Sequence, residues 1–136
     1  MYRILIPVDD DEDRAIAQAE FVADLPLSGD GIEVTVTHAL HGEELDAPEA
    51  MRNPNRIATV RRARDALEDA GIEATIGEIA QPPAEGILDL AEEVDADLLV
   101  LGGRKQSPAG KVLFGSVTQE VLLETDRPVV VTGGGD

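Results

Sequence analysis

The chain has 136 residues, with 28 Asp and Glu against 11 Lys and Arg, so its formal net charge is −17. This charge argues against nucleic acid or an anionic membrane as a main partner, because both repel an acidic surface. Cysteine is absent, which excludes disulfides and thiolate metal sites. The hydrophobic content of 43 %, with only 2 % aromatics, predicts one domain over residues 1–136 with an aliphatic core.

The first half of the chain alternates between strand and helix patterns. Residues 3–8, which are apolar from Ile4 onward, predict a buried strand, and residues 15–25 carry apolar positions at helical spacing. Residues 32–40 alternate in the manner of a second strand. Residues 42–54 are polar with two prolines and predict a long, mobile loop, after which residues 57–70 read as a helix.

The second half repeats this alternation. A third strand is predicted over residues 72–79, and a helix over residues 84–94 follows a proline suited to a first helical turn. Residues 98–101 are continuously apolar, as in a strand covered on both faces. A helix over residues 116–124 and a strand over residues 128–132 complete the series. The glycine-rich tail, residues 133–136, lies outside it.

Strands and helices that alternate throughout predict a parallel α/β sheet with right-handed crossovers. In such sheets, ligands bind beyond the carboxyl ends of the strands, where the strand order reverses. Loops rich in special residues follow the first strand (residues 7–13) and the fourth strand (residues 102–116). If these two strands are neighbours, both loops meet at one crevice.

The second of these loops is the main candidate for a ligand site. Residues 98–119 contain no acid, although about one residue in five of the chain is acidic, and they hold Arg104, Lys105 and Lys111. Glycine lets a backbone approach a ligand closely, and a helix N-terminus presents N–H groups to anions. The loop is therefore a candidate phosphate site. Its glycines are Gly102, Gly103, Gly110 and Gly115.

The chain resembles the universal stress protein family over nearly its whole length. The matching segments are Ile4–Asp9, Val36–Ala39, Ala96–Gly102, Gly115–Thr118 and Arg127–Val131. With the alternating pattern, this resemblance predicts a single open, twisted, parallel five-stranded sheet with helices on both faces. The fold is Rossmann-like, with strand order 3-2-1-4-5.

In that family, ATP binding is marked by a glycine, two residues, a second glycine, nine residues and then Gly-Ser or Gly-Thr. Gly102 fits the first glycine and Gly115–Ser116 fits the end, but Lys105 stands where the second glycine belongs. Its ammonium can replace the backbone contact with a point charge. Alternatively, its Cβ forbids the positive φ of a glycine, and the loop closes. Both interpretations remain open.

The resemblance implies that Asp9 contacts the adenine–ribose end of a nucleotide and that the Ala39 backbone meets the base. The alternatives are that Asp9 caps the next helix and that Ser116 is only an N-cap. Acids at residues 10–13 standing near a triphosphate would need Mg²⁺ or high salt. The candidate binding residues are Pro7, Val8, Asp9, Ala39, Gly102, Gly103, Arg104, Lys105, Gly115, Ser116, Val117 and Thr118.

These features predict a stress-type regulator that binds ATP or a related adenine nucleotide, with Mg²⁺, beyond the first and fourth strands. The resemblance implies a homodimer through Pro128–Val131. No catalytic constellation or metal site is apparent, so we expect no enzyme, and a slow ATPase is the weakest alternative. Without a leader pattern we expect a cytoplasmic protein, and the acidity suggests a salty cytoplasm. The competing hypothesis is a dimeric interaction module that binds no nucleotide because Lys105 alters its pocket.

Overall fold

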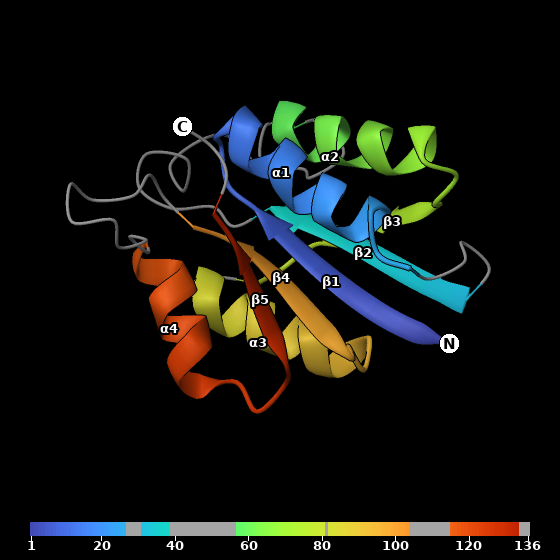
Figure 1. Cartoon of the computed structure of the whole chain (residues 1–136). Coiled ribbons are helices and arrows are strands. Elements are labelled where there is room, and N and C mark those ends of the chain that lie inside the picture. Colours follow the sequence, from blue (N-terminus) through green and yellow to red (C-terminus); the bar gives the residue numbers. More distant parts are fainter. Residues whose placement is uncertain (27–30, 39–56, 81, 104–114, 134–136) are drawn as a thin grey trace.

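Helices cover both faces of a five-stranded parallel sheet in the computed structural model (Figure 1). The strand order is β3-β2-β1-β4-β5, which confirms the predicted order. The strands are β1 (Tyr2–Val8), β2 (Ile32–His38), β3 (Ala74–Ile76), β4 (Leu98–Gly102) and β5 (Val129–Thr132). The helices are α1 (Glu12–Ala23), α2 (Ala58–Asp69), α3 (Pro83–Glu93) and α4 (Ser116–Glu124). The structure describes residues 1–26, 31–38, 57–80, 82–103 and 115–133.

Most predicted elements agree with the structure to within two residues, but two do not. Helix α1 begins three residues before the predicted start, because Asp11 is its N-cap and accepts a 2.9 Å hydrogen bond from the Arg14 amide. Apolar spacing detects only the buried face of a helix, so it misses an acidic first turn. The third strand is much shorter than predicted, at three residues. The loop predicted at residues 42–54 lies outside the described residues.

The sheet separates two hydrophobic cores. Helices α1 and α2 pack on one face over Ile4, Ile6 and Val34, and α3 and α4 pack on the other over Leu5 and Leu99 (Figure 1). All five of these side chains are at most 1 % exposed. Burial on both faces explains why Ile4–Val8 of β1 and Leu98–Leu101 of β4 are continuously apolar.

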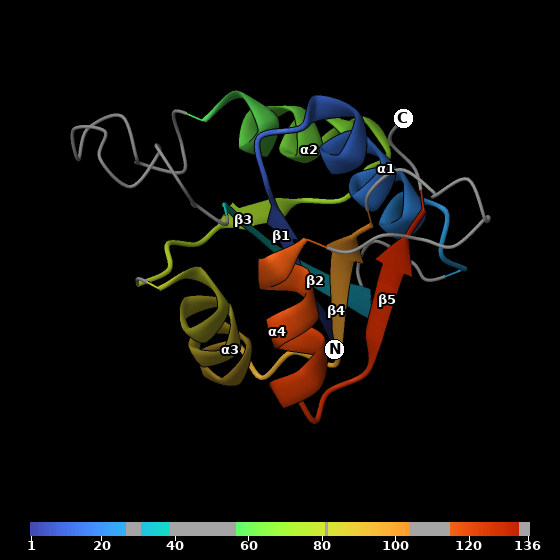
Figure 2. The ribbon, with the colours of Figure 1, turned by 90° about the vertical axis from the view of Figure 1, so that its left-hand side faces the viewer.

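The strand order reverses between β1 and β4. The chain leaves β1 for α1 on one face of the sheet, and it leaves β4 toward α4 on the other (Figure 2). The pairing of β1 with β4 runs over Ile4↔Leu98 and Leu5↔Leu99, whereas β1 stays paired with β2 as far as Val8↔His38. The carboxyl ends of β1 and β4 therefore flank the switch point where parallel α/β sheets bind their ligands.

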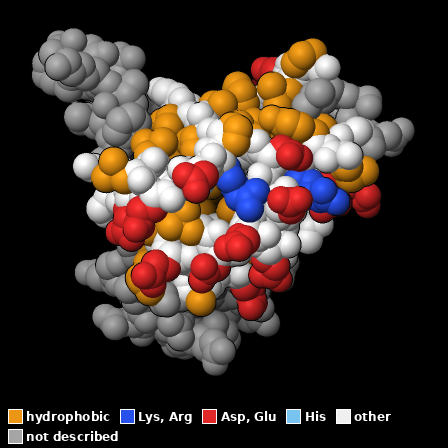
Figure 3. Space-filling view, turned by 90° about the horizontal axis from the view of Figure 1, so that it is seen from below, with side chains coloured by type: hydrophobic (Ala, Val, Ile, Leu, Met, Phe, Trp, Pro, Cys, Tyr) orange, Lys and Arg blue, Asp and Glu red, His pale blue; other side chains and the backbone are white. Residues whose placement is uncertain are grey.

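Acidic side chains spread over the outer face of the α3 and α4 layer (Figure 3). On these two helices the exposed acids are Glu85, Asp89, Glu92, Glu93, Glu120 and Glu124.

Within the described ranges, no helix combines the length and apolar character needed to cross a membrane.

Candidate functional site

A pocket opens at the carboxyl ends of β1 and β4, between the β1–α1 loop and the start of α4. The β1–α1 loop therefore meets the two described ends of the second loop, Gly102 and Gly115, because β1 and β4 are neighbours as expected. The lining combines apolar side chains with polar groups, a common composition for small-molecule sites. The lining residues are Pro7, Asp9, Gln18, Ile87, Leu101, Gly102, Gly115, Ser116, Val117 and Thr118.

The first turn of α4 forms one side of the pocket. Gly115 is the N-cap, with φ −73° and ψ 165°, and no side chain caps this helix. The reading of Ser116 as an N-cap is therefore wrong, since Ser116 is already helical. The first hydrogen bond within the helix runs from the Gln119 amide to the Gly115 carbonyl at 3.0 Å. The preceding amides have no partner within the helix, and such groups attract anions.

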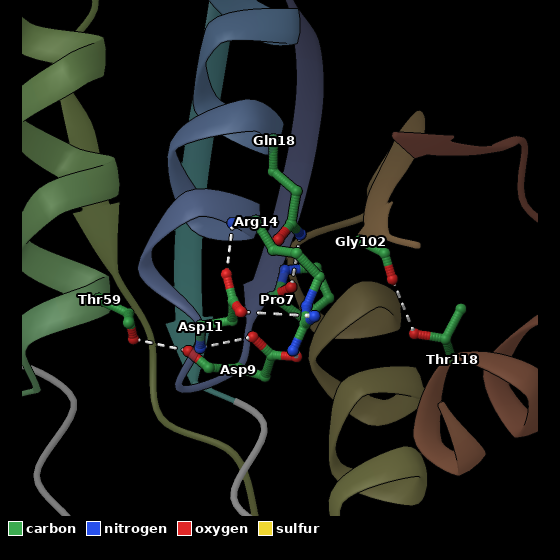
Figure 4. A network of polar contacts seen from close by, with 8 residues as sticks. All are labelled: Pro7, Asp9, Asp11, Arg14, Gln18, Thr59, Gly102 and Thr118. Atoms are coloured by element: carbon green, nitrogen blue, oxygen red, sulfur yellow. Dashed lines mark hydrogen bonds and ion pairs between the residues drawn. The ribbon is translucent and has the colours of Figure 1, made fainter. Parts of the chain in front are cut away.

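Gly102 lies at the end of β4, opposite the Pro7 end of β1. A Cβ on Gly102 would stand 2.9 Å from Gln18 Oε1 and 3.5 Å from Arg14 Cδ. The Thr118 hydroxyl donates to the Gly102 carbonyl at 3.5 Å, which joins β4 to α4 (Figure 4). A Cβ at this position would press on the Gln18 amide, so the close packing of α1 against β4 favours glycine here.

Asp9 is held from three directions (Figure 4). One carboxylate oxygen accepts from the Asp11 amide at 2.9 Å, and the other accepts from Arg14 Nε at 3.1 Å and lies 2.9 Å from Arg14 Nη2. Its carbonyl accepts from the Thr59 hydroxyl at 2.6 Å. The helix cap is therefore Asp11, and the proposal that Asp9 caps α1 is wrong. Asp9 presents an oriented carboxylate in the pocket lining.

Arg14 offsets part of the acidic run at the pocket. Its side chain is 15 % exposed and also lies 3.5 Å from Asp11 Oδ2. Glu12 pairs at 2.7 Å with Arg62 of α2, where both side chains are about half exposed. The acids after β1 are thus partly neutralised, which weakens the repulsion expected for a triphosphate. Arg64 of α2 also lies near an acid, at 3.9 Å from Asp65.

Gln18 was not among the predicted site residues. Its amide nitrogen donates to the carbonyls of Pro7 at 2.7 Å and Val100 at 3.0 Å, and the side chain is 1 % exposed. The sequence does carry one sign of its role: Gln18 is the single polar residue on the buried face of α1, whose other members are Ala15, Ala19 and Val22. Two further lining residues are apolar and resemble ordinary core positions in sequence. These are Ile87 and Leu101.

The remaining candidates lie away from the pocket lining or outside the described residues. Val8 is fully buried in the core under α1 and α2. The Gly103 amide donates to the Thr132 carbonyl at 2.8 Å and extends the β4–β5 pairing. The others are Ala39, Arg104 and Lys105, which the described ranges do not include. Among the described residues, no group of three or more His, Asp or Glu side chains could hold a metal ion.

Comparison with known proteins gives a consistent result. Residues 1–133 match the model of the universal stress protein family. A universal stress protein of Thermus aquaticus is 29 % identical and covers 96 % of this chain and 98 % of its own length. The Bacillus subtilis stress response protein NhaX is 32 % identical over 65 % of this chain, and a Mycolicibacterium smegmatis universal stress protein is 43 % identical over 47 % of it. The matched segments span about half the length of these last two relatives, 54 % and 50 %.

Solved structures resemble this fold closely. A universal stress protein from Archaeoglobus fulgidus has a TM-score of 0.77 and 31 % identity, and the match covers 97 % of this chain and 98 % of the other. A structure of the universal stress protein from the same organism in complex with dAMP has a TM-score of 0.73 and 27 % identity, with the same coverage. The sheet described above therefore belongs to a fold that recurs in proteins of similar length.

Proposed function

Because the chain belongs to the universal stress protein family, we propose that it is a regulator that binds ATP or a related adenine nucleotide in the pocket between β1 and β4. The observation that carries this proposal is the first turn of α4, which opens into that pocket without a side-chain cap. Its amides and the hydroxyls of Ser116 and Thr118 are suited to phosphate oxygens.

The opposite side of the pocket suits the base and the sugar. Pro7, Ile87 and Leu101 supply apolar surface, and Asp9 supplies an oriented carboxylate that can accept hydrogen bonds. A related structure contains dAMP, which supports an adenine nucleotide as the ligand. We assign the base and sugar to Pro7, Asp9 and Ala39. We assign the phosphates to Gly102, Arg104, Lys105, Gly115, Ser116, Val117 and Thr118. Val8 and Gly103 adjoin these residues in the chain but are not among the residues that line the pocket.

The proposed role is regulatory and not enzymatic. A hydrolase would need a base to activate water, and Asp9, the carboxylate in the pocket lining, is already held by Arg14. Mg²⁺ would enter with the nucleotide, bridging phosphate oxygens that the acids after β1 would otherwise repel.

We further propose a homodimer through β5, with Pro128–Val131 at the contact. Strand β5 lies at one edge of the sheet, and its four residues are only partly buried. An apolar edge strand invites pairing with another strand. A dimeric module without nucleotide is the competing function, and the experiment below separates the two.

Mass spectrometry can identify the ligand directly. The purified protein is denatured, and the small molecules that it releases are analysed. Purification in molar KCl keeps the acidic chain screened. We expect an adenine nucleotide in near-stoichiometric amount from the wild type and much less from Gly115→Val, which fills the phosphate side of the pocket. Equal, trace amounts from both proteins would favour the dimeric module.

A further inference from the structure

The strands that carry the pocket separate just below it. The pairing of β1 with β4 stops at Leu5↔Leu99, although β1 continues to Val8 and β4 to Gly102. Beyond that point each strand follows its outer neighbour, as Val8↔His38 and Gly102↔Thr132 show. Peptide groups that face the gap must find other partners, because an unpaired buried carbonyl is costly.

Gln18 bridges this gap. Its side-chain nitrogen donates to the Pro7 carbonyl on β1 at 2.7 Å (Figure 4). The same nitrogen donates to the Val100 carbonyl on β4 at 3.0 Å. A carboxamide has two N–H groups, so both are used on the two strands. Since the side chain is 1 % exposed, water competes little for these hydrogen bonds.

The same side chain sets how close α1 comes to the pocket wall. Its Oε1 atom lies against Gly102, where a Cβ would stand only 2.9 Å away. Pro7 on β1 and Gly102 on β4 both line the pocket, as Gln18 itself does. Gln18 donates to the Pro7 carbonyl and lies against Gly102, so its contacts act on the two strands that carry the lining.

We propose that Gln18 is a positioning residue that fixes the width of the pocket by holding β1 and β4 together where they separate. This inference rests on the proposed function and deepens it. It names the residue that keeps β1, which carries the base side of the pocket, at a set distance from β4, which carries the phosphate side. A ligand that spans both sides depends on that distance, whereas an anion bound at the first turn of α4 does not.

The test compares binding of ATP and of inorganic tripolyphosphate to the wild type and to Gln18→Met. Methionine has a similar length but donates no hydrogen bond. We expect the variant to bind ATP at least about tenfold more weakly and to bind tripolyphosphate within about twofold of the wild type. Equal ATP affinity in the two proteins, or a parallel loss for both ligands, would overturn the proposal.

Val22→Ala is the matched control. Val22 lies about one turn further along α1, is 1 % exposed and does not line the pocket. This variant should lose stability and keep the ATP affinity of the wild type. If it loses as much affinity as Gln18→Met, binding merely follows stability and Gln18 has no positioning role.

Two further measurements cover other outcomes. If Gln18→Met does not fold, Gln18→Asn replaces it, because asparagine keeps the amide on a side chain too short to reach both carbonyls. We expect this variant to bind ATP more weakly and tripolyphosphate as the wild type does. ATP affinity equal to that of the wild type would overturn the proposal. If the wild type binds no ATP, the proposed function fails, and crystal structures then decide the role of Gln18. A larger separation of Pro7 from Gly102 in the variant supports it, and an unchanged separation overturns it.

Discussion

Arg14 determines the charge that a ligand meets at the pocket rim. It pairs with Asp9 at 2.9 Å and lies 3.5 Å from Asp11. Sequence alone shows an acidic run followed by one arginine, and it does not show which acids the arginine contacts. The structure shows that the arginine turns back toward β1, so Asp9 is both neutralised and oriented.

Replacing Arg14 should therefore affect stability and binding together. We expect Arg14→Gln to lower the free energy of unfolding by about 1–2 kcal/mol, because a partly buried ion pair with two hydrogen-bonded contacts is lost. ATP affinity should also fall, and more in about 0.1 M than in about 2 M KCl, because screening replaces the lost positive charge. Chemical denaturation and titration at both salt concentrations measure these effects.

Arg62→Gln serves as the control for this experiment. Its pair with Glu12 is short, at 2.7 Å, but the side chains are 57 % and 53 % exposed. Exposed ion pairs contribute little to stability, so Arg62→Gln should lower the free energy of unfolding by less than about 0.5 kcal/mol and leave ATP affinity unaltered. If the two arginine variants behave alike, Arg14 has no special role at the pocket.

Gly115 tests the phosphate side of the pocket. Its φ of −73° is open to any residue, so Gly115→Val adds bulk at the pocket without backbone strain and weakens the N-cap by about 1 kcal/mol. We expect ATP binding to fall at least about tenfold while the far-UV spectrum is retained. Gly133→Val is the control, because a Cβ there meets nothing within 4 Å. Unchanged binding by Gly115→Val would place the ligand elsewhere.

At the level of elements, the order of helices and strands could be predicted from the sequence. Buried helices show apolar residues at helical spacing, and the central strands show short, continuously apolar runs. The limits are local. The start of α1 is hidden by its acidic first turn, and β3 is an edge strand with only three paired residues. The pocket lining could be predicted where a glycine or a loop marks it, as at Gly102 and Gly115. It could not be predicted at Gln18, whose role depends on two carbonyls that come together only in the fold.

The edge strand β5 yields a test of the proposed dimer. The carbonyls of Pro128 and Thr132 accept from β4, so by alternation the amides of Val129 and Val131 point away from it. Val131→Pro should block pairing across the edge while preserving the bonds to β4. Sedimentation should report a monomer with native secondary structure. Leu123→Lys, at an exposed position on α4 (78 % exposed), should remain a dimer; the reverse pattern would place the interface on α4.

At the scale of the whole molecule, charge dominates. A net charge of −17 on 136 residues creates self-repulsion that destabilises the compact state in dilute buffer. The screening length falls from about 10 Å at 0.1 M salt to about 3 Å at 1 M. The melting temperature should therefore rise between about 0.1 M and about 2 M KCl, as calorimetric scans would show. A flat or falling melting temperature would mean that local pairs such as Arg14 with Asp9 already balance the surface.

The central claim is that the crevice between β1 and β4 holds an adenine nucleotide by its phosphates at the first turn of α4. Isothermal titration of the wild type with ATP and with AMP, at saturating Mg²⁺ in about 2 M KCl, tests it most directly. We predict saturable binding with a higher affinity for ATP than for AMP. The additional phosphates of ATP are expected to meet the N-terminus of α4 and the cations Arg104, Lys105 and Lys111. Equal affinities, or no heat at millimolar ligand, would contradict it.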